Sequence, residues 1–334
     1  MPFLPSILSR AGRAAKSAAL VLCGVSGMAR SQLAGEGAVL SFHGLRADGV
    51  PAGIEDEAMH LPVSVFRSLC THLAARYDVM PLGEMAAVLG RGEKLPPNAV
   101  AITFDDGYAS NYELGFPVLK ELGLPATIFL ATGFLDGDAP LWFQQVDLAM
   151  GLGGQVREGE TLARTLEYLK KLPDEVMRGE VGRLLERVAA MPAAEAVPEV
   201  MRPMTWAQAR EMRDSGLIDL GGHTHTHPIL ARCGLEKQRW EVEKCRDRMQ
   251  TELGAAPRLF AFPNGGEGDF TDETLRLVRE AGFESAWTMI SGRATPGGAV
   301  MSMPRYGSPV TVWEAEATVS GAYELVRQWR GAAS

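Results

Sequence analysis

The feature that most constrains the fold is an alternation of short apolar runs with stretches of helical periodicity, which begins near residue 38. Short apolar runs are typical of buried strands, and apolar residues at spacings of three and four indicate helices. Strands that alternate with helices form parallel βαβ units, so we predict an α/β fold of about seven strands in a closed or partly closed barrel. The expected strands are 38–42, 100–104, 126–130, 218–220 and 259–262, and the expected helices are 63–77, 111–122, 235–253 and 272–281.

One long segment, residues 135–203, interrupts this alternation. It contains helical patterns at 161–171 and 174–189, followed by a loop rich in proline, alanine and glutamate at 192–203. We interpret it as a helical insertion within a single domain, because a barrel fits a chain of 334 residues as well as two domains do. The domain is expected to span 38–310, with a C-terminal helix at 311–334.

The N-terminal segment, residues 1–37, carries Arg10, Arg13 and Lys16 ahead of a short apolar run at 18–28. That run is too short to span a bilayer, and glycines interrupt it. We interpret the segment as an amphipathic leader that lies on a membrane surface or on the domain itself. A secretory signal is the alternative, although the context for cleavage is poor. We therefore expect a cytoplasmic or membrane-associated protein rather than a secreted or periplasmic one.

Net charge and cysteine spacing argue against two further classes of protein. The formal net charge is -8 and the body of the chain has no basic run, so nucleic acid is not an expected partner. No two cysteines have the CxxC spacing of a thiolate zinc site, and no disulfide framework is indicated. We expect scattered thiols, of which there are four: Cys23, Cys70, Cys233 and Cys245.

Two short polar segments follow predicted strands. The first, TFDDGY at 103–108, places Asp105 and Asp106 directly after a buried strand, where two charges are costly unless something pairs them. The second, GGHTHTHP at 221–228, holds three of the six histidines of the chain. Alone, the first could be a turn or a helix cap, and the second a solvated loop. Both nevertheless lie at the carboxyl ends of predicted parallel strands, where α/β folds place their sites.

These residue types suit a metal centre. His223 and His227 can reach one cation together with Asp106, and two imidazoles plus a carboxylate with open positions are typical of catalytic metal sites. The segments at 103–108 and 223–228, in this order and separation, resemble the first two motifs of the polysaccharide deacetylases (NodB homology domain, carbohydrate esterase family four). The resemblance covers about residues 38–307.

The resemblance implies a distorted (β/α) barrel and a divalent metal, usually Zn²⁺. It implies that Asp106, His223 and His227 are the metal ligands and that Asp105 is the general base, while His225 matches no ligand and is interpreted as a loop side chain. The expected activity is hydrolysis of N-acetyl groups on a polysaccharide or glycolipid. Two alternatives stay open: an amidohydrolase acting on a non-sugar amide or cyclic imide, and an inactive glycan-binding relative.

Three departures from the family pattern affect the expected catalytic residues. Where the family has RPPYG, this chain has AFPNG at 261–265, so Ala261 replaces the arginine beside the base and Asn264 replaces the tyrosine. The late histidine of the family is also absent, because none follows His227. We expect His43, at the end of the first strand, to supply the general acid, as the N-terminal histidine of one subgroup suggests. Arg305 is the candidate for the lost arginine. The alternatives are a structural histidine and a surface ion pair.

Overall fold

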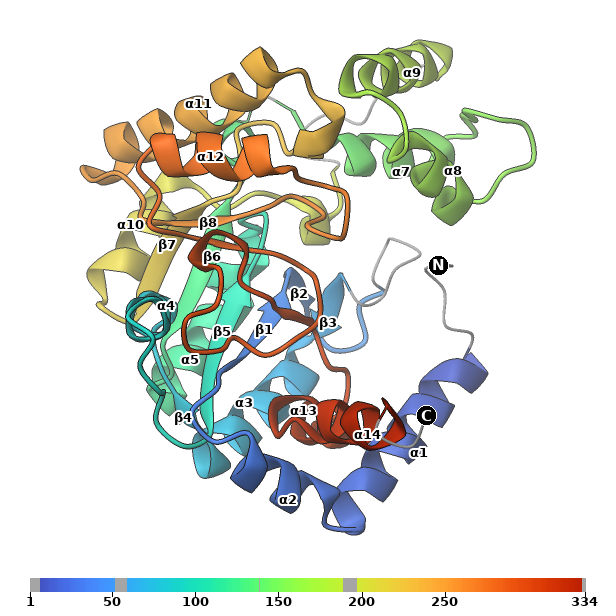
Figure 1. Cartoon of the computed structure of the whole chain (residues 1–334). Coiled ribbons are helices and arrows are strands. Elements are labelled where there is room, and N and C mark those ends of the chain that lie inside the picture. Colours follow the sequence, from blue (N-terminus) through green and yellow to red (C-terminus); the bar gives the residue numbers. More distant parts are fainter. Residues whose placement is uncertain (1–6, 52–58, 138, 189–196, 332–334) are drawn as a thin grey trace.

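The computed structural model describes residues 7–51, 59–137, 139–188 and 197–331. Its centre is one parallel sheet with the strand order β10-β1-β5-β6-β7-β8-β9, and β4 pairs with β5 beyond this path. The sheet curls into a half-barrel surrounded by helices (Figure 1). The predicted distorted α/β barrel is confirmed. The strands are β1 (Ala38–Phe42), β4 (Asp78–Val79), β5 (Ala99–Phe104), β6 (Ala126–Leu130), β7 (Ile218–Gly222), β8 (Leu259–Ala261), β9 (Ser285–Trp287) and β10 (Tyr306–Gly307).

Both faces of the sheet are buried, and alternate residues of a strand enter different cores. In β1, Leu40 and Phe42 belong to the larger core, whereas Val39 belongs to a second core lined by α4 (Leu82–Gly90). This alternation follows from the two-residue period of a strand. Burial on both faces explains why these strands read as continuous apolar runs in the sequence.

Most predicted helices are present. Those around the sheet are α3 (Val63–Arg76), α5 (Phe116–Leu122), α11 (Leu235–Leu253) and α12 (Asp272–Glu280), and α10 (Trp206–Asp214) is present without having been predicted. The predicted helix at 111–122 differs in its first part, which is a π-helical turn at Asn111–Gly115. Pro117 has no N–H group to donate to the preceding turn, so the regular helix begins only at Phe116.

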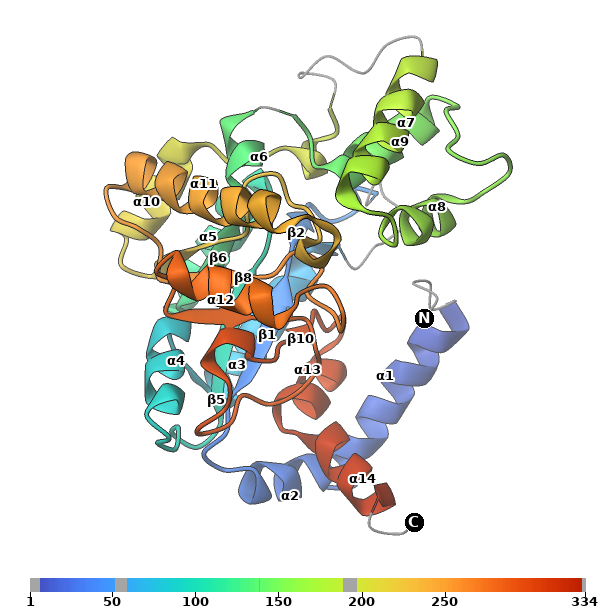
Figure 2. The same cartoon turned by 45° about the horizontal axis from the view of Figure 1, so that its top comes forward.

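The segment predicted as a helical insertion forms a separate group of helices beside the sheet (Figures 1 and 2). After α6 (Thr132–Asp136) come α7 (Trp142–Gly151), α8 (Leu162–Leu169) and α9 (Asp174–Arg187). These three share a small core of their own that includes Trp142, Val146 and Leu184. Part of the predicted loop at 192–203 lies outside the described residues, as do residues 1–6 and 332–334 of the predicted terminal segments.

Helices from the two ends of the chain pack together in one terminal module, made of α1 (Ile7–Leu22), α2 (Val25–Gln32), α13 (Val312–Val319) and α14 (Ala322–Gly331). Arg30 of α2 forms an ion pair of 2.8 Å with the buried Glu316 of α13. The prediction of a single C-terminal helix at 311–334 is wrong, because the described part of this segment forms two helices, α13 and α14. The break lies at Gly321, which has a φ of 83° and where a Cβ atom would lie 2.4 Å from the side chain of Leu33. Among the described residues, no helix is both long and apolar enough to cross a bilayer.

Candidate metal centre and catalytic carboxylate

The carboxyl ends of neighbouring strands bring the two polar segments together. Asp105 and Asp106 follow β5, and the histidine loop at 223–227 follows β7. The intervening strand, β6, pairs with both. The N–H group of Asp105 donates to the carbonyl of Phe42 in β1, and that of His223 donates to the carbonyl of Leu130 in β6. The sheet thus fixes where each segment begins.

Three buried side chains form a compact cluster of potential ligands. The Nε2 atoms of His227 and His223 lie 3.1 and 3.5 Å from Oδ1 of Asp106. One ligand atom from each of the three residues lies within 4.8 Å of the others. Neither carboxylate oxygen of Asp106 accepts a hydrogen bond from the described residues. A buried carboxylate without donors is costly, so this donor set fits a divalent cation. The role of Asp106, His223 and His227 as metal ligands stays a prediction.

The rings of the cluster are also oriented for coordination. Nδ1 of His223 lies 2.8 Å from the carbonyl oxygen of Ala261, an acceptor that places the proton on Nδ1 and leaves Nε2 free to face Asp106. Burial lowers the pKa of His223 to about 4, which favours the neutral ring that a metal requires. Ala261 stands where the family has an arginine, and its backbone carbonyl oxygen still helps to orient His223.

Backbone strain is concentrated in these two loops. Asp106, Thr224 and His227 have φ values of 74°, 65° and 56°, in the left-handed region that non-glycine residues rarely occupy. The N–H group of His227 donates to Oγ1 of Thr224 at 3.1 Å, which helps to hold this conformation. Such strain collects at functional sites, where the surrounding structure enforces it.

Arg305 lies fully buried against Asp105. Its Nη1 and Nη2 atoms donate to the two carboxylate oxygens at 2.7 and 2.8 Å, and Nη1 also donates to Oγ1 of Thr103 at 3.1 Å. Burial alone would raise the pKa of Asp105, but the Arg305 guanidinium, with smaller effects of His223 and His43, holds it below its usual range. The structure thus places Arg305 where the sequence expected a replacement arginine, and not in a surface ion pair.

His43 lies between β1 and β2 (Gly44–Arg46), partly exposed, at the same end of the sheet. Its carbonyl oxygen accepts a hydrogen bond of 2.7 Å from Nδ2 of Asn111. Burial raises the pKa of Asp106, but His227, His43 and His223 together outweigh burial and hold this pKa well below its usual range. The role of His43 as the general acid stays a prediction.

Two other histidines are buried near the site. His60 begins β3 (His60–Pro62), and burial lowers its pKa to about 4. Its ring fills the space left by Gly44 in the paired strand β2, where a Cβ atom would lie 2.1 Å from Nδ1. His225 is buried, and its Nδ1 atom lies 2.8 Å from Oγ1 of Thr132. The sequence carried no signal for either contact.

Three further contacts shape the histidine loop and its surroundings. The side chain of Asn264 donates to Asp269, and its φ is 61°, so the residue that replaces the family's tyrosine forms a tight turn. Glu241 of α11 and Arg178 of α9 contact the histidine loop, although neither stood out in the sequence.

The fold and this site define the class of protein. A family model described as polysaccharide deacetylase matches residues 92–286, which is more than half of the chain. The chain belongs to the polysaccharide deacetylase family. Members of this family use a divalent metal, in agreement with the cluster around Asp106.

Relatives with known names cover different parts of the chain. A Bacillus subtilis (strain 168) protein, YxkH, is 43% identical over 54 residues, which are 16% of this chain and 19% of that protein. The poly-beta-1,6-N-acetyl-D-glucosamine N-deacetylase of Escherichia coli (strain K12) is 23% identical over 274 residues, covering 72% of this chain and 33% of that protein. This chain thus matches a third or less of the length of these relatives.

Solved structures show the same fold. The Streptococcus pyogenes deacetylase PplD superposes with a TM-score of 0.60 and 17% identity, over 85% of this chain and 98% of that chain. IcaB from Ammonifex degensii gives a TM-score of 0.57 and 20% identity, over 85% and 97%.

Proposed function

We propose that this chain is a metal-dependent hydrolase that removes N-acetyl groups from a polysaccharide or glycolipid. The observation that carries the proposal is the cluster of Asp106, His223 and His227 beside a carboxylate, Asp105, that a buried arginine keeps ionised. The name of the Escherichia coli relative supports an N-acetylglucosamine polymer as the substrate class.

Zn²⁺ is the cation that this donor set would suit best, because imidazole nitrogens and carboxylate oxygens are its usual ligands in hydrolases. Asp106, His223 and His227 would hold the cation, which would supply a Lewis acid for the acetyl carbonyl and for water. Asp105, ionised by its contact with Arg305, takes a proton from the water that attacks the amide carbon. His43 then donates a proton to the amine nitrogen as the carbon–nitrogen bond breaks, which releases acetate and the free amine.

Metal analysis of the purified protein, together with acetate release from N-acetylglucosamine oligomers, tests the proposal. We expect one divalent cation per chain, and His223→Ala or His227→Ala should lose both the cation and the activity. His72→Gln is the control, because His72 lies in α3, where it contacts Glu316. Full metal occupancy in either ligand variant would contradict the site. Hydrolysis of a cyclic imide or other non-sugar amide, without acetate release from the oligomers, would favour the alternative amidohydrolase.

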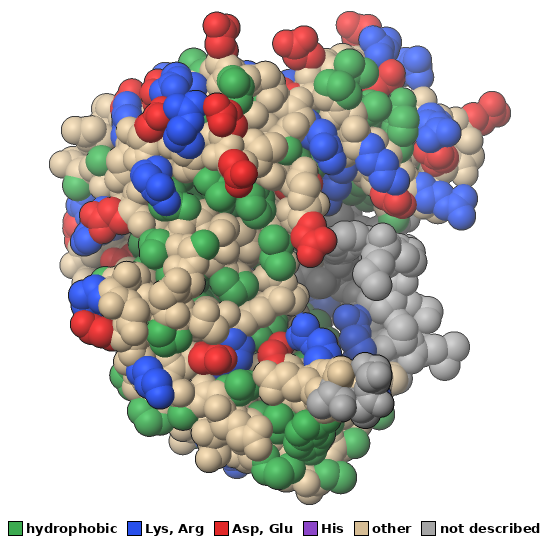
Figure 3. All heavy atoms as spheres, viewed as in Figure 1, with side chains coloured by type: hydrophobic (Ala, Val, Ile, Leu, Met, Phe, Trp, Pro, Cys, Tyr) green, Lys and Arg blue, Asp and Glu red, His purple; other side chains and the backbone are tan. Residues whose placement is uncertain are grey.

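We also propose that the terminal module contacts the surface of an anionic membrane, which favours a cytoplasmic or membrane-associated location. Residues 7–32 contain no Asp or Glu in a chain of net charge -8, and Arg13 and Lys16 are exposed. On the same module, 75% of Leu22 and 45% of Trp329 are exposed. Hydrophobic side chains gather at the lower end of the molecule in Figure 3, where Figure 1 shows these helices. A basic surface with exposed apolar side chains is typical of interfacial helices.

A further inference from the structure

Thr226, the residue before the proposed ligand His227, is held by hydrogen bonds from two sides. Its N–H group donates to Oε2 of Glu241 at 2.7 Å, and its hydroxyl lies 2.5 Å from Oε1 of the same carboxylate. From the other side, Nη2 of Arg178 donates to the Thr226 hydroxyl at 2.8 Å and to its carbonyl oxygen at 3.3 Å. All the polar groups of Thr226 are thus engaged.

Glu241 is placed to act on the loop and on little else. It lies on α11, its side chain is fully buried, and it also accepts the N–H group of His225 at 2.9 Å. Lys237, one turn earlier on the helix, balances its charge at 2.9 Å. A carboxylate that accepts several charge-balanced hydrogen bonds in a buried position is a strong local constraint.

Arg178 connects the loop to the helical insertion. It lies on α9, where Asp174 orients its guanidinium at 2.9 Å. The insertion also provides Phe143 of α7, whose ring meets that of His227 edge to face at 5.4 Å. The insertion therefore packs on the ligand itself and bonds to the residue before it.

We propose that Glu241 and Arg178 are positioning residues that fix Thr226 and thereby hold His227 as a ligand, which makes the helical insertion part of the metal centre. His227 needs this support because its φ of 56° is unfavourable for a residue with a side chain. Without the hydrogen bonds of Glu241 and Arg178 to Thr226, the loop relaxes and Nε2 of His227 moves away from Asp106. The inference rests on the proposed metal-dependent function.

The test compares metal affinity, measured by chelator competition with Zn²⁺, in matched pairs of variants. Glu241→Ala is paired with Glu243→Ala, a change of the same charge on the same helix at a side chain that is 40% exposed. Arg178→Met is paired with Arg183→Met, an exposed arginine of α9 that contacts Glu180. Groups that orient metal ligands are typically worth 10–100-fold in affinity, so we expect losses of about that size for Glu241→Ala and Arg178→Met only.

A second pair keeps the test decisive if Glu241→Ala fails to fold. Thr226→Val removes the hydroxyl and keeps the shape, whereas Thr226→Ser keeps the hydroxyl. We expect Thr226→Val to weaken Zn²⁺ binding and to alter the visible absorption of the Co²⁺-loaded protein, and Thr226→Ser to restore both. Affinities and spectra that match the controls would overturn the positioning role and leave the proposed function intact. Absence of metal binding in the parent protein would instead overturn the proposed function.

Discussion

At the residue scale, Asp105 shows how the chain compensates for a missing side chain. The family's arginine position is Ala261, yet Arg305, next to β10 and far along the sequence, reaches the same carboxylate with two hydrogen bonds. In the sheet, β10 and β5 lie on either side of β1, so Arg305 needs to reach across only one strand to meet Asp105. The pairing of the carboxylate with an arginine is therefore kept, although the arginine comes from a different position in the sequence.

Replacing Asp105 separates base catalysis from metal binding. Asp105→Asn keeps the shape of the side chain and leaves Asp106, His223 and His227 in place, so the protein should retain its cation. Turnover should fall by roughly 10²–10⁴-fold, the usual contribution of a general base. Metal analysis and acetate release, measured on the same preparation, check the retained cation and the reduced turnover. A variant that hydrolyses the substrate at the parent rate would place the base elsewhere.

Replacing His43 tests the proton donor. His43→Ala should bind metal normally but hydrolyse amides poorly, because an amine leaves only after protonation. An activated ester, whose leaving group needs little protonation, should be affected less. The ratio of the two rates is the measurement. Equal losses on both substrates would indicate a structural or orienting role instead.

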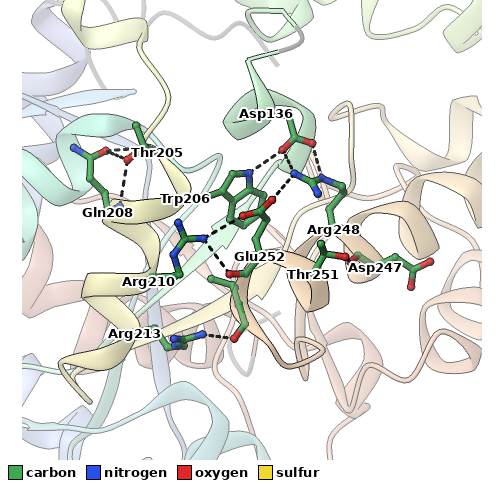
Figure 4. A network of polar contacts seen from close by, with 11 residues as sticks. Asp136, Thr205, Trp206, Gln208, Arg210, Arg213, Asp247, Arg248, Thr251 and Glu252 are labelled. Atoms are coloured by element: carbon green, nitrogen blue, oxygen red, sulfur yellow. Dashed lines mark hydrogen bonds and ion pairs between the residues drawn. The ribbon is translucent and has the colours of Figure 1, made fainter.

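At the element scale, one polar network joins three helices on one side of the half-barrel (Figure 4). Asp136 at the end of α6 accepts from Nε1 of Trp206 in α10 and from Nε of Arg248 in α11, both at 2.8 Å. Arg248 also contacts Glu252 at 2.9 Å, and Glu252 pairs with Arg210 of α10 at 3.1 Å. The network thus holds α6, which directly follows β6, against the helices behind it.

Removing the charge of Asp136 should destabilise this side of the fold. Hydrogen bonds to charged groups contribute about 1.5–3 kcal/mol each, so Asp136→Asn should lower the free energy of unfolding by an amount of that order and reduce the melting temperature. Asp247→Asn, at an exposed aspartate of α11 that pairs with Arg246, is the control. If the two variants melt alike, the network contributes little.

The same carboxylate predicts a dependence on pH. Burial raises the pKa of Asp136, but the hydrogen bonds from Arg248 and Trp206, together with nearby positive charge, outweigh burial and lower the pKa below its usual value. Because the folded pKa is the lower one, its stabilisation is complete above the unfolded pKa of about 3.9 and is lost as the pH falls through the folded value. In Asp136→Asn, that part of the acid-induced loss of stability should be absent.

The elements differ in how far the sequence could predict them. The strand at 126–130 and the helix at 235–253 match the structure residue for residue, because one is a bounded apolar run and the other a long amphipathic pattern. The strands β2 and β3 have three residues each, too few to show a period. Helix α7 was also not predicted.

In the site, the sequence predicted residues that stand in a local pattern but not those brought together by folding. Asp105, Asp106 and the histidines stood out because polar residues follow apolar strands at the same edge of the sheet. Glu241 did not, because its spacing on a highly charged helix resembles that of Glu236 or Glu243. Its contact with the loop depends on how the chain folds back after β7, which no local pattern records.

At the scale of the whole molecule, the terminal module gives a test of the proposed membrane contact. The intact protein should sediment with vesicles that contain phosphatidylglycerol and much less with vesicles of pure phosphatidylcholine, because each basic residue near an anionic surface contributes about 1 kcal/mol. Reversing the exposed charges of Arg13 and Lys16 to Glu should reduce binding, and added salt should weaken it. Equal binding to both kinds of vesicle would remove the electrostatic part of the proposal.

The proposed cation would tie the folding equilibrium of the chain to the concentration of free metal in solution, because the buried carboxylate of Asp106 accepts no hydrogen bond from the described residues. A ligand that binds only the folded state adds about 2.7 kcal/mol of stability when its concentration is about 100 times the dissociation constant. The melting temperature should therefore rise with added Zn²⁺ and fall with a chelator, and not in His227→Ala. In a cell, the supply of metal would then set both the activity of the protein and how long each copy survives.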